Sequence, residues 1–196
     1  MFLYSISNNI VIGIVIAAVA LLAIILIIAW IVSRNNLVAL DTACDEAWST
    51  IDIYLKKRYD LIPNLVETVK GYTKHESETL ERVIAARNVA VSATNPNEKI
   101  AADNALTGTL RQVYSLKEHY PDLKASTQFI SLQKQLQEIE SELSQSRKFY
   151  NGKCKAYNTK LRTFPSNLVA SSMHLEKRFY FELDSEQERQ NVKVSF

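Results

Sequence analysis

The longest apolar run in the sequence covers residues 10–32, which are 23 positions without a charged side chain. Its most polar members are Gly13 and the indole of Trp30. As a helix the run would be about 34 Å long, enough to cross a hydrocarbon core of about 30 Å. A core helix of a soluble bundle would have a polar side, and this run has none. The pattern therefore predicts a membrane-spanning helix over residues 10–32, preceded by a short tail of residues 1–9.

A cleaved signal peptide is the main alternative for this run. Such a peptide needs a basic segment, a shorter apolar core and small residues at a cleavage site. Residues 1–9 contain no Lys or Arg, and the run is followed by Ser33 and Arg34. We therefore expect an uncleaved single-pass anchor in the cell membrane. Because Arg34 is the first basic residue on either side, the N-terminus is expected outside and the C-terminal domain in the cytoplasm.

Beyond the run, apolar residues recur every three or four positions, as is typical of amphipathic helices. Asn95, Pro96 and Glu98 form a cap with a first-turn proline, so a helix is expected over residues 96–120. A final helix over residues 122–163 has a heptad-like, coiled-coil seam. The helical domain thus covers residues 33–165. In the tail of residues 166–196, two short apolar pieces, 179–183 and 192–196, suggest a small hairpin or segments that drape over the helices.

Pro63 interrupts the first amphipathic segment, and two outcomes fit the pattern. Proline removes one helical hydrogen bond and disfavours the helical conformation of the residue before it. The helix could kink and continue, since the apolar spacing carries across Pro63. Alternatively, Asp60 could cap a new helix with Pro63 in its first turn. In either case the segment is a candidate structural corner or docking site, formed by Tyr59, Asp60, Pro63 and Asn64.

Composition supports long helices, because the whole chain has four glycines and four prolines, too few for the turns of a sheet-rich fold. The net charge of +2 gives no reason to expect nucleic acid. Cys44 and Cys154 lie 110 residues apart and match no metal-site spacing. A disulfide between them would require that the domain face an oxidising compartment.

Catalytic patterns are lacking in the sequence. None of His75, His119 and His174 has an acid three residues before it, as a carboxylate-bridged metal site in a bundle requires. There is no H-E-x-x-H or P-loop string. The sequence does not exclude a catalytic Cys–His pair formed by residues that are distant in the chain. We expect no enzyme activity, no cofactor and no metal, with a hydrolase of unrecognised site as the alternative.

Residues 143–163 are basic and contain no acid, which makes them a candidate interaction face for anionic lipid or an acidic partner. The alternative is a solvated face neutralised within the molecule by Glu182, Asp184, Glu186 and Glu188. The basic residues of this candidate face are Arg147, Lys148, Lys153, Lys155, Lys160 and Arg162.

Five strings carry a resemblance to one family: AWSTIDIYLKKRYDLIPNLVETVKGYTKHE (47–76), YPDLKAS (120–126), RKFYN (147–151), YNTKLRTFPSNLVA (157–170) and FYFE (179–182). In this order they are similar to the LemA family from about Leu37 to the C-terminus. The glycine and phenylalanine usual between the last two strings are replaced by residues 171–175. The resemblance implies one N-terminal membrane helix, a short external N-terminus and an antiparallel four-helix bundle, without an established enzymatic activity. That description favours a helix break at Pro63, with helices over residues 36–60 and 61–93.

Some members of the family take part in building magnetosome membranes, so the resemblance suggests a role in organising membranes or membrane proteins. With no catalytic pattern found, our leading hypothesis is a membrane-anchored, non-enzymatic helical scaffold or adaptor. The alternative is a regulatory or assembly partner of a membrane-bound protease or signalling complex. The protein partners are not identified by the sequence, and self-association into a homo-oligomer stays open.

Overall fold

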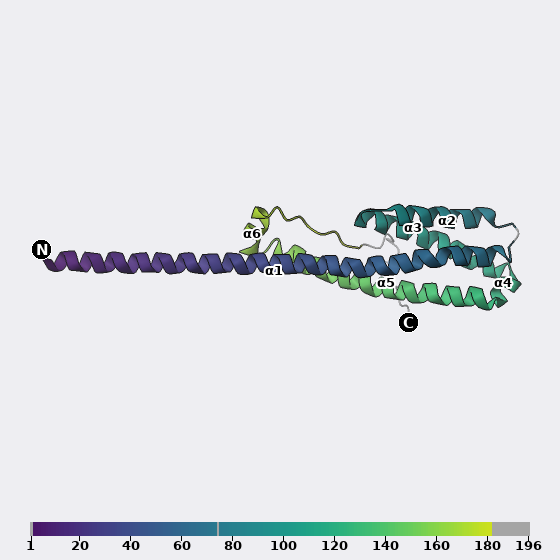
Figure 1. Ribbon diagram of the computed structural model, residues 1–196, viewed down its shortest axis with the longest axis horizontal. Helices are drawn as coiled ribbons and strands as arrows, with labels where there is room; N and C mark the ends of the chain where they lie inside the picture. The colour runs from purple at the N-terminus through teal and green to yellow at the C-terminus, as the bar shows by residue number, and fades with distance from the viewer. Residues whose placement is uncertain (1, 74, 182–196) are drawn as a thin grey trace, which may run out of the picture. The chain divides into compact units, whose positions relative to one another are not determined.

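The computed structural model describes residues 2–73 and 75–181, with side chains from Ile12 onward. Helices account for nearly all of this part of the chain, and it contains no strand, which confirms the all-α fold class (Figure 1). The helices in chain order are α1 (Phe2–Lys70), α2 (Ser77–Ser92), α3 (Pro96–Ser115), the 3₁₀ turn η1 (Leu116–Glu118), α4 (Pro121–Ala125), α5 (Thr127–Lys160) and α6 (Ser166–Ser172).

The chain divides into two compact units. The first unit comprises residues 1–44 and 153–178, and the second comprises residues 45–152 and 179–196. Both α1 and α5 contribute residues to each unit, because each helix runs past a unit boundary.

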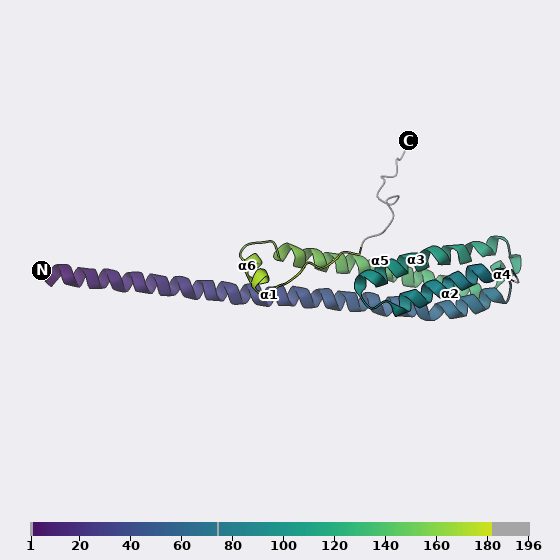
Figure 2. The same ribbon diagram turned by 90° about the horizontal axis from the view of Figure 1, so that it is seen from above.

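The second unit is a four-helix bundle. The part of α1 from residue 45, α2, α3 and the part of α5 up to residue 152 lie side by side and alternate in direction in both views (Figures 1 and 2). This confirms the antiparallel arrangement. Helices α1, α3 and α5 each bury an apolar stripe at the expected spacing, so burial of apolar surface drives their packing. The fully buried members of these stripes include Ile51, Leu55, Ile62, Leu106, Leu110 and Leu143.

The predicted break at Pro63 is wrong, because α1 continues through it to Lys70. Buried apolar residues lie on both sides of the proline, Ile62 before it and Leu65 and Val66 after it. Packing of this stripe outweighs the local preference of proline to end a helix. Pro63 has no N–H for the Tyr59 carbonyl, and the guanidinium of Arg87 on α2 donates to that oxygen instead (Nε···O 3.3 Å). The lost backbone hydrogen bond is thus replaced from a neighbouring helix.

The cap predicted before α3 is confirmed. The Asn95 side chain accepts a hydrogen bond from the Glu98 N–H at 2.9 Å, and the Glu98 carboxylate accepts from the Thr94 N–H at 3.3 Å. These contacts satisfy backbone donors that the first turn of a helix leaves unpaired. Pro96 occupies the first turn, where its missing N–H does no harm.

Three other predicted boundaries need correction. The second predicted helix, residues 61–93, is divided between the end of α1, up to Lys70, and α2, which begins at Ser77. The third ends at Ser115 and continues as η1. The fourth is two helices, α4 and α5, because Ser126 is extended and its hydroxyl accepts from the Phe129 N–H, which starts a new helix.

The C-terminal tail differs from the expected hairpin as far as it is described. It contains α6, and residues 179–181 are irregular. Residues 182–196, which include the second piece of the predicted hairpin and the acidic residues expected to neutralise the basic face, lie outside the described part of the chain. After α6, His174 has φ = 52°, in the left-handed region that favours glycine.

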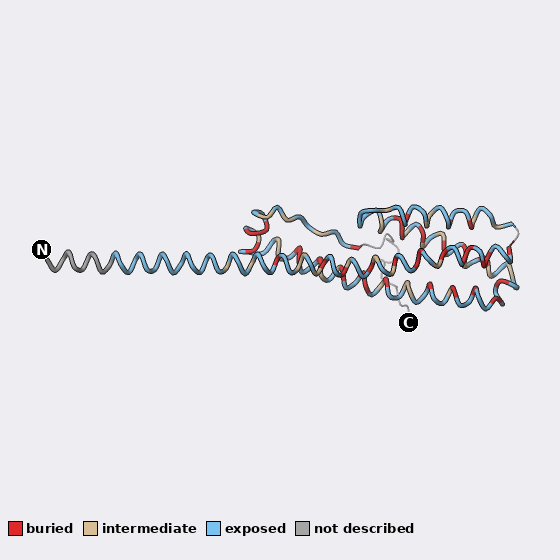
Figure 3. Tube along the Cα trace, viewed as in Figure 1, coloured by how far each residue is buried: buried red, intermediate tan, exposed pale blue. Residues whose placement is uncertain are grey.

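The first unit combines a long exposed apolar helix with a small core. In that core the buried residues Leu37, Val169 and Ala170 pack with Leu161, Met173 and Leu175. From Ile12 to Val32, by contrast, every large apolar side chain of α1 is exposed (Figure 3). No part of the described chain covers this stretch of α1.

The Arg87 contact predicts a specific pattern in a double-mutant cycle. Arg87→Leu should lower the free energy of unfolding by about 1–2 kcal/mol, because it leaves the Tyr59 carbonyl without a donor. In a Pro63→Ala background the same change should have a much smaller effect, since residue 63 then supplies an N–H. Urea unfolding followed by circular dichroism measures all four variants.

Arg82→Leu is the matched control for Arg87→Leu. Arg82 also lies on α2, but its side chain is half exposed and lies 3.6 Å from Glu78. Its loss should change the free energy of unfolding by less than about 0.5 kcal/mol. If Arg87→Leu lowers the free energy of unfolding equally with and without Pro63, Arg87 does not replace the hydrogen bond that proline removes.

Candidate functional site: a buried charge network and a polar groove

A cluster of charged side chains lies inside the bundle of the second unit. Asp103 on α3 is fully buried, with no exposed surface. Arg58 from α1 donates to one of its carboxylate oxygens at 2.9 Å, and Arg147 from α5 donates to the other. Glu140, about two turns before Arg147 on α5, lies 3.0 Å from Arg58 and 3.4 Å from Arg147. Two guanidinium groups and two carboxylates therefore balance in charge.

Most polar atoms of the network are paired, but Arg147 Nε and Glu140 Oε2 are buried without a hydrogen-bond partner among the described groups, and Glu140 Oε2 has only the ion-pair contact with Arg58. A second nitrogen of Arg58 donates to the Thr107 hydroxyl at 2.9 Å, and this hydroxyl lies 3.0 Å from the Asp103 carbonyl. The Tyr59 hydroxyl is buried beside the cluster and has no hydrogen-bond partner among the described groups. Burial and the nearby Asp103 carboxylate raise the pKa of the Tyr59 phenol, so this group is neutral at physiological pH.

One residue of the C-terminal segment covers the network. The ring of Phe181 lies 4.4 Å from the Arg147 guanidinium carbon and stacks on Trp48 with ring centroids 6.4 Å apart. The Asn151 side chain donates to the Phe181 carbonyl at 2.9 Å and accepts from the Phe181 N–H at 2.7 Å. Tyr150 completes the cluster by meeting Trp48 edge to face at 5.5 Å. Phe181 is thereby held by its backbone as well as by its ring.

This arrangement is suited to structure rather than to acid–base chemistry. Both oxygens of the Asp103 carboxylate are engaged by guanidinium groups, and the residue has no exposed surface that a substrate could touch. Burial raises the pKa of Asp103, an effect that Arg58 and Arg147 oppose. A buried carboxylate between two arginines from other helices fixes how those helices align.

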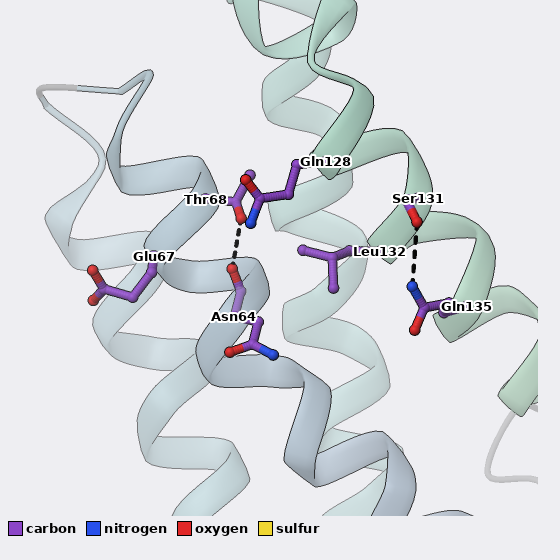
Figure 4. A pocket seen from close by; sticks show the side chains of 7 residues that line it. All are labelled: Asn64, Glu67, Thr68, Gln128, Ser131, Leu132 and Gln135. Atoms are coloured by element: carbon purple, nitrogen blue, oxygen red, sulfur yellow. Dashed lines mark hydrogen bonds between the residues drawn. The ribbon is translucent and has the colours of Figure 1, made fainter.

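A polar groove lies between α1 and α5 in the same unit, with a volume of about 430 Å³. Figure 4 shows its lining, in which the Thr68 hydroxyl donates to the Asn64 carbonyl at 2.7 Å and the Gln135 amide donates to Ser131 at 3.2 Å. Most lining residues are polar and on the surface, which is typical of a hydrated gap between helices. The lining residues are Asn64, Glu67, Thr68, Gln128, Ser131, Leu132 and Gln135.

The four residues of the predicted corner do not form one site. Because α1 is continuous, these residues do not separate two helices, and a structural corner formed by a kink stays a prediction. Tyr59 is buried beside the charge network, whereas Asp60 and Pro63 are exposed and Asn64 lines the polar groove. A docking role for the exposed members stays a prediction.

The predicted basic face loses one member. Arg147 is buried and paired with Asp103 and Glu140, so it belongs to the network. Lys148 is exposed in the second unit, and Lys155 and Arg162 are exposed in the first. Lys153 and Lys160 are half-buried. A role of these five residues in contacting lipid or an acidic partner stays a prediction.

In the described part of the chain, no three His, Cys, Asp or Glu side chains come close enough to hold a metal ion. The two cysteines are both buried free thiols in the first unit. Their neighbours in that unit include the ion pair between Asp41 and Arg178, whose closest atoms are 2.8 Å apart.

Sequence reasoning missed most of the network. A signal was present, because Arg58 follows Leu55 by three positions and precedes Ile62 by four, which places a charge in the apolar stripe. Likewise, Asp103 precedes Leu106 by three positions, and Arg147 follows Leu143 by four. Charged residues at core spacing on three helices, with opposite signs, indicate a buried network.

The fold and this site define a class: a helical bundle with a buried charge network and an N-terminal helix that is long and apolar enough to cross a membrane. The chain belongs to the LemA family, whose model matches residues 47–196. It is also similar to Protein LemA of Metamycoplasma hominis, with 29% identity over 166 residues that cover 83% of this chain and 74% of that protein. The resemblance noted in the sequence is therefore confirmed.

The network predicts that Asp103 is essential to stability. Asp103→Asn should lower the free energy of unfolding by about 3–5 kcal/mol, because it leaves two buried guanidinium groups without the charge that offsets their burial. Urea unfolding at neutral pH measures the effect. Asp60→Asn, an exposed acid in α1, is the control and should change it by less than about 0.5 kcal/mol. Similar midpoints for the two variants would contradict the structural role.

Proposed function

We propose that this protein is a membrane-anchored, non-enzymatic helical adaptor, which holds its bundle at the cytoplasmic face of the cell membrane and presents it to protein partners. The observation that carries the proposal is the exposed apolar stretch of α1. The large side chains between Ile12 and Val32 are 44–64% exposed, and no described residue packs on them. Such a surface is unfavourable in water and favourable in lipid.

Exposed apolar side chains on α2 support binding to other proteins. On α2, the side chains of Ile84, Val89 and Val91 are 42%, 60% and 52% exposed. Val89 also lines a hollow of about 510 Å³ between α2 and α3, whose mostly small lining residues would allow a partner helix to approach closely. The lining residues are Val89, Ser92, Ala93, Glu98, Ala101, Ala102 and Ala105.

The adaptor function predicts that partner contacts depend on the anchor. A photo-crosslinking residue at position 91 should give discrete adducts with membrane-associated proteins in cells. Val19→Arg with Leu22→Arg should release the chain from the alkali-washed membrane fraction and abolish these adducts, because each arginine near the bilayer centre costs about 2.5–3.5 kcal/mol.

Val89→Arg is the matched control for anchoring. Val89 is 60% exposed, against 61% for Val19 and 57% for Leu22, but it lies on α2. This variant should stay in the membrane fraction. Release of both variants, or identical adducts with and without the anchor, would contradict the proposal.

The orientation predicts the labelling of introduced cysteines. The native cysteines are first removed by Cys44→Ala and Cys154→Ala. Thr94 is exposed in the turn between α2 and α3, and a cysteine introduced there by Thr94→Cys should react with an impermeant maleimide only after cells are opened. Asn8→Cys, before the apolar run, should react in intact cells. The basis is the position of Arg34 after the run, with no Lys or Arg before it. The reverse labelling pattern would contradict a cytoplasmic bundle.

A further inference from the structure

The fold brings together the two cysteines of the chain. Cys44 on α1 and Cys154 on α5 are 110 positions apart in sequence, and both have no exposed surface. Within the first unit, Arg178 pairs with Asp41, one turn before Cys44, and its backbone bonds to Asn158, one turn after Cys154, so the two cysteines lie at the same level of the antiparallel helices α1 and α5. Facing thiols on two packed helices have the proximity that a disulfide needs.

We propose that Cys44 and Cys154 form a reversible redox site, at which a low-molecular-weight disulfide converts the two thiols into an intramolecular disulfide that ties α1 to α5. This site stands apart from the adaptor role, and in a cytoplasmic domain the bond forms transiently, when the surroundings become oxidising. The resting pair is protected from reaction, because burial and the neighbouring Cys154 raise the pKa of the Cys44 thiol to about 12. Oxidation therefore follows a local opening of the first unit.

The route of access is the segment that carries Arg178. Residues 173–178 follow α6 without forming a helix. Asn158 on α5 holds this segment by donating to the Arg178 carbonyl at 2.8 Å and accepting from the Arg178 N–H at 2.9 Å. The Arg178 guanidinium pairs with Asp41, one turn before Cys44 on α1, and its charge acts on the Cys44 thiol. Release of this segment would uncover the thiols.

The exchange is balanced in atoms and electrons. The thiolate of one cysteine attacks the external disulfide, which forms a mixed disulfide and releases one external thiol. The second cysteine then attacks the mixed disulfide and releases the second thiol. One S–S bond breaks in the oxidant and one forms in the protein. Two electrons pass from the protein to the oxidant, and the two protein thiol protons end on the released thiols.

The test treats the purified full-length chain in detergent micelles with oxidised glutathione, then alkylates it with N-ethylmaleimide under denaturing conditions. We expect most chains to lose two hydrogen atoms in mass, to take up neither maleimide nor glutathione, and to give one crosslinked peptide containing both cysteines. The bond closes a long loop, so Tm should rise by roughly 5 °C or more and return on reduction.

Variants separate this site from non-specific oxidation. Cys44→Ala and Cys154→Ala should each form no internal bond and show no rise in Tm. Asn158→Ala should speed the oxidation several-fold by loosening the Arg178 segment, whereas Asn88→Ala, an exposed residue on α2, should leave the rate unchanged. The proposal is overturned if glutathione adducts or intermolecular dimers are the only products, or if neither the native chain nor the Asn158→Ala variant forms the internal bond.

Discussion

A buried carboxylate between two guanidinium groups is the constraint on which the bundle depends. Asp103 from α3 has no contact with solvent, so its charge must be offset by Arg58 from α1 and Arg147 from α5. Apolar stripes alone would let these helices slide by a turn at little loss of buried area. The bonds to both oxygens of one carboxylate are satisfied in a single alignment. The network thereby specifies how α1, α3 and α5 pack, while apolar burial supplies the driving force.

Side-chain amides play a similar role for the segment after α6. In the first unit Asn158 bonds to both the N–H and the carbonyl of Arg178, and in the second unit Asn151 does the same for Phe181. Irregular backbone needs partners for its polar groups once it lies against a protein surface. An asparagine supplies one donor and one acceptor, which is the pair that a neighbouring strand would offer. The extended segment is thus fixed without a sheet.

Prediction from the sequence was best where a local pattern decides the structure. The all-α class, the N-terminal apolar helix and the cap at Asn95 follow from residue spacing and composition. The break at Pro63 was wrong, because the donor that replaces the missing N–H comes from Arg87, 24 positions later in the chain. Such a partner is visible only when α2 is placed beside α1. The basic face was assigned by counting charges, which cannot tell the buried Arg147 from the exposed Lys148.

The strings that carried the family resemblance contain Arg58, Arg147, Asn151, Asn158 and Phe181. The role of Arg58 and Arg147, however, depends on Asp103 and Glu140, which lie outside the strings. By itself the sequence determined which segments are helical and which stretch is too apolar for water, because both depend on residues near one another in the chain. The tertiary structure alone decided which charges are buried together and that Cys44 meets Cys154. Contacts between residues so far apart in sequence depend on how the helices pack.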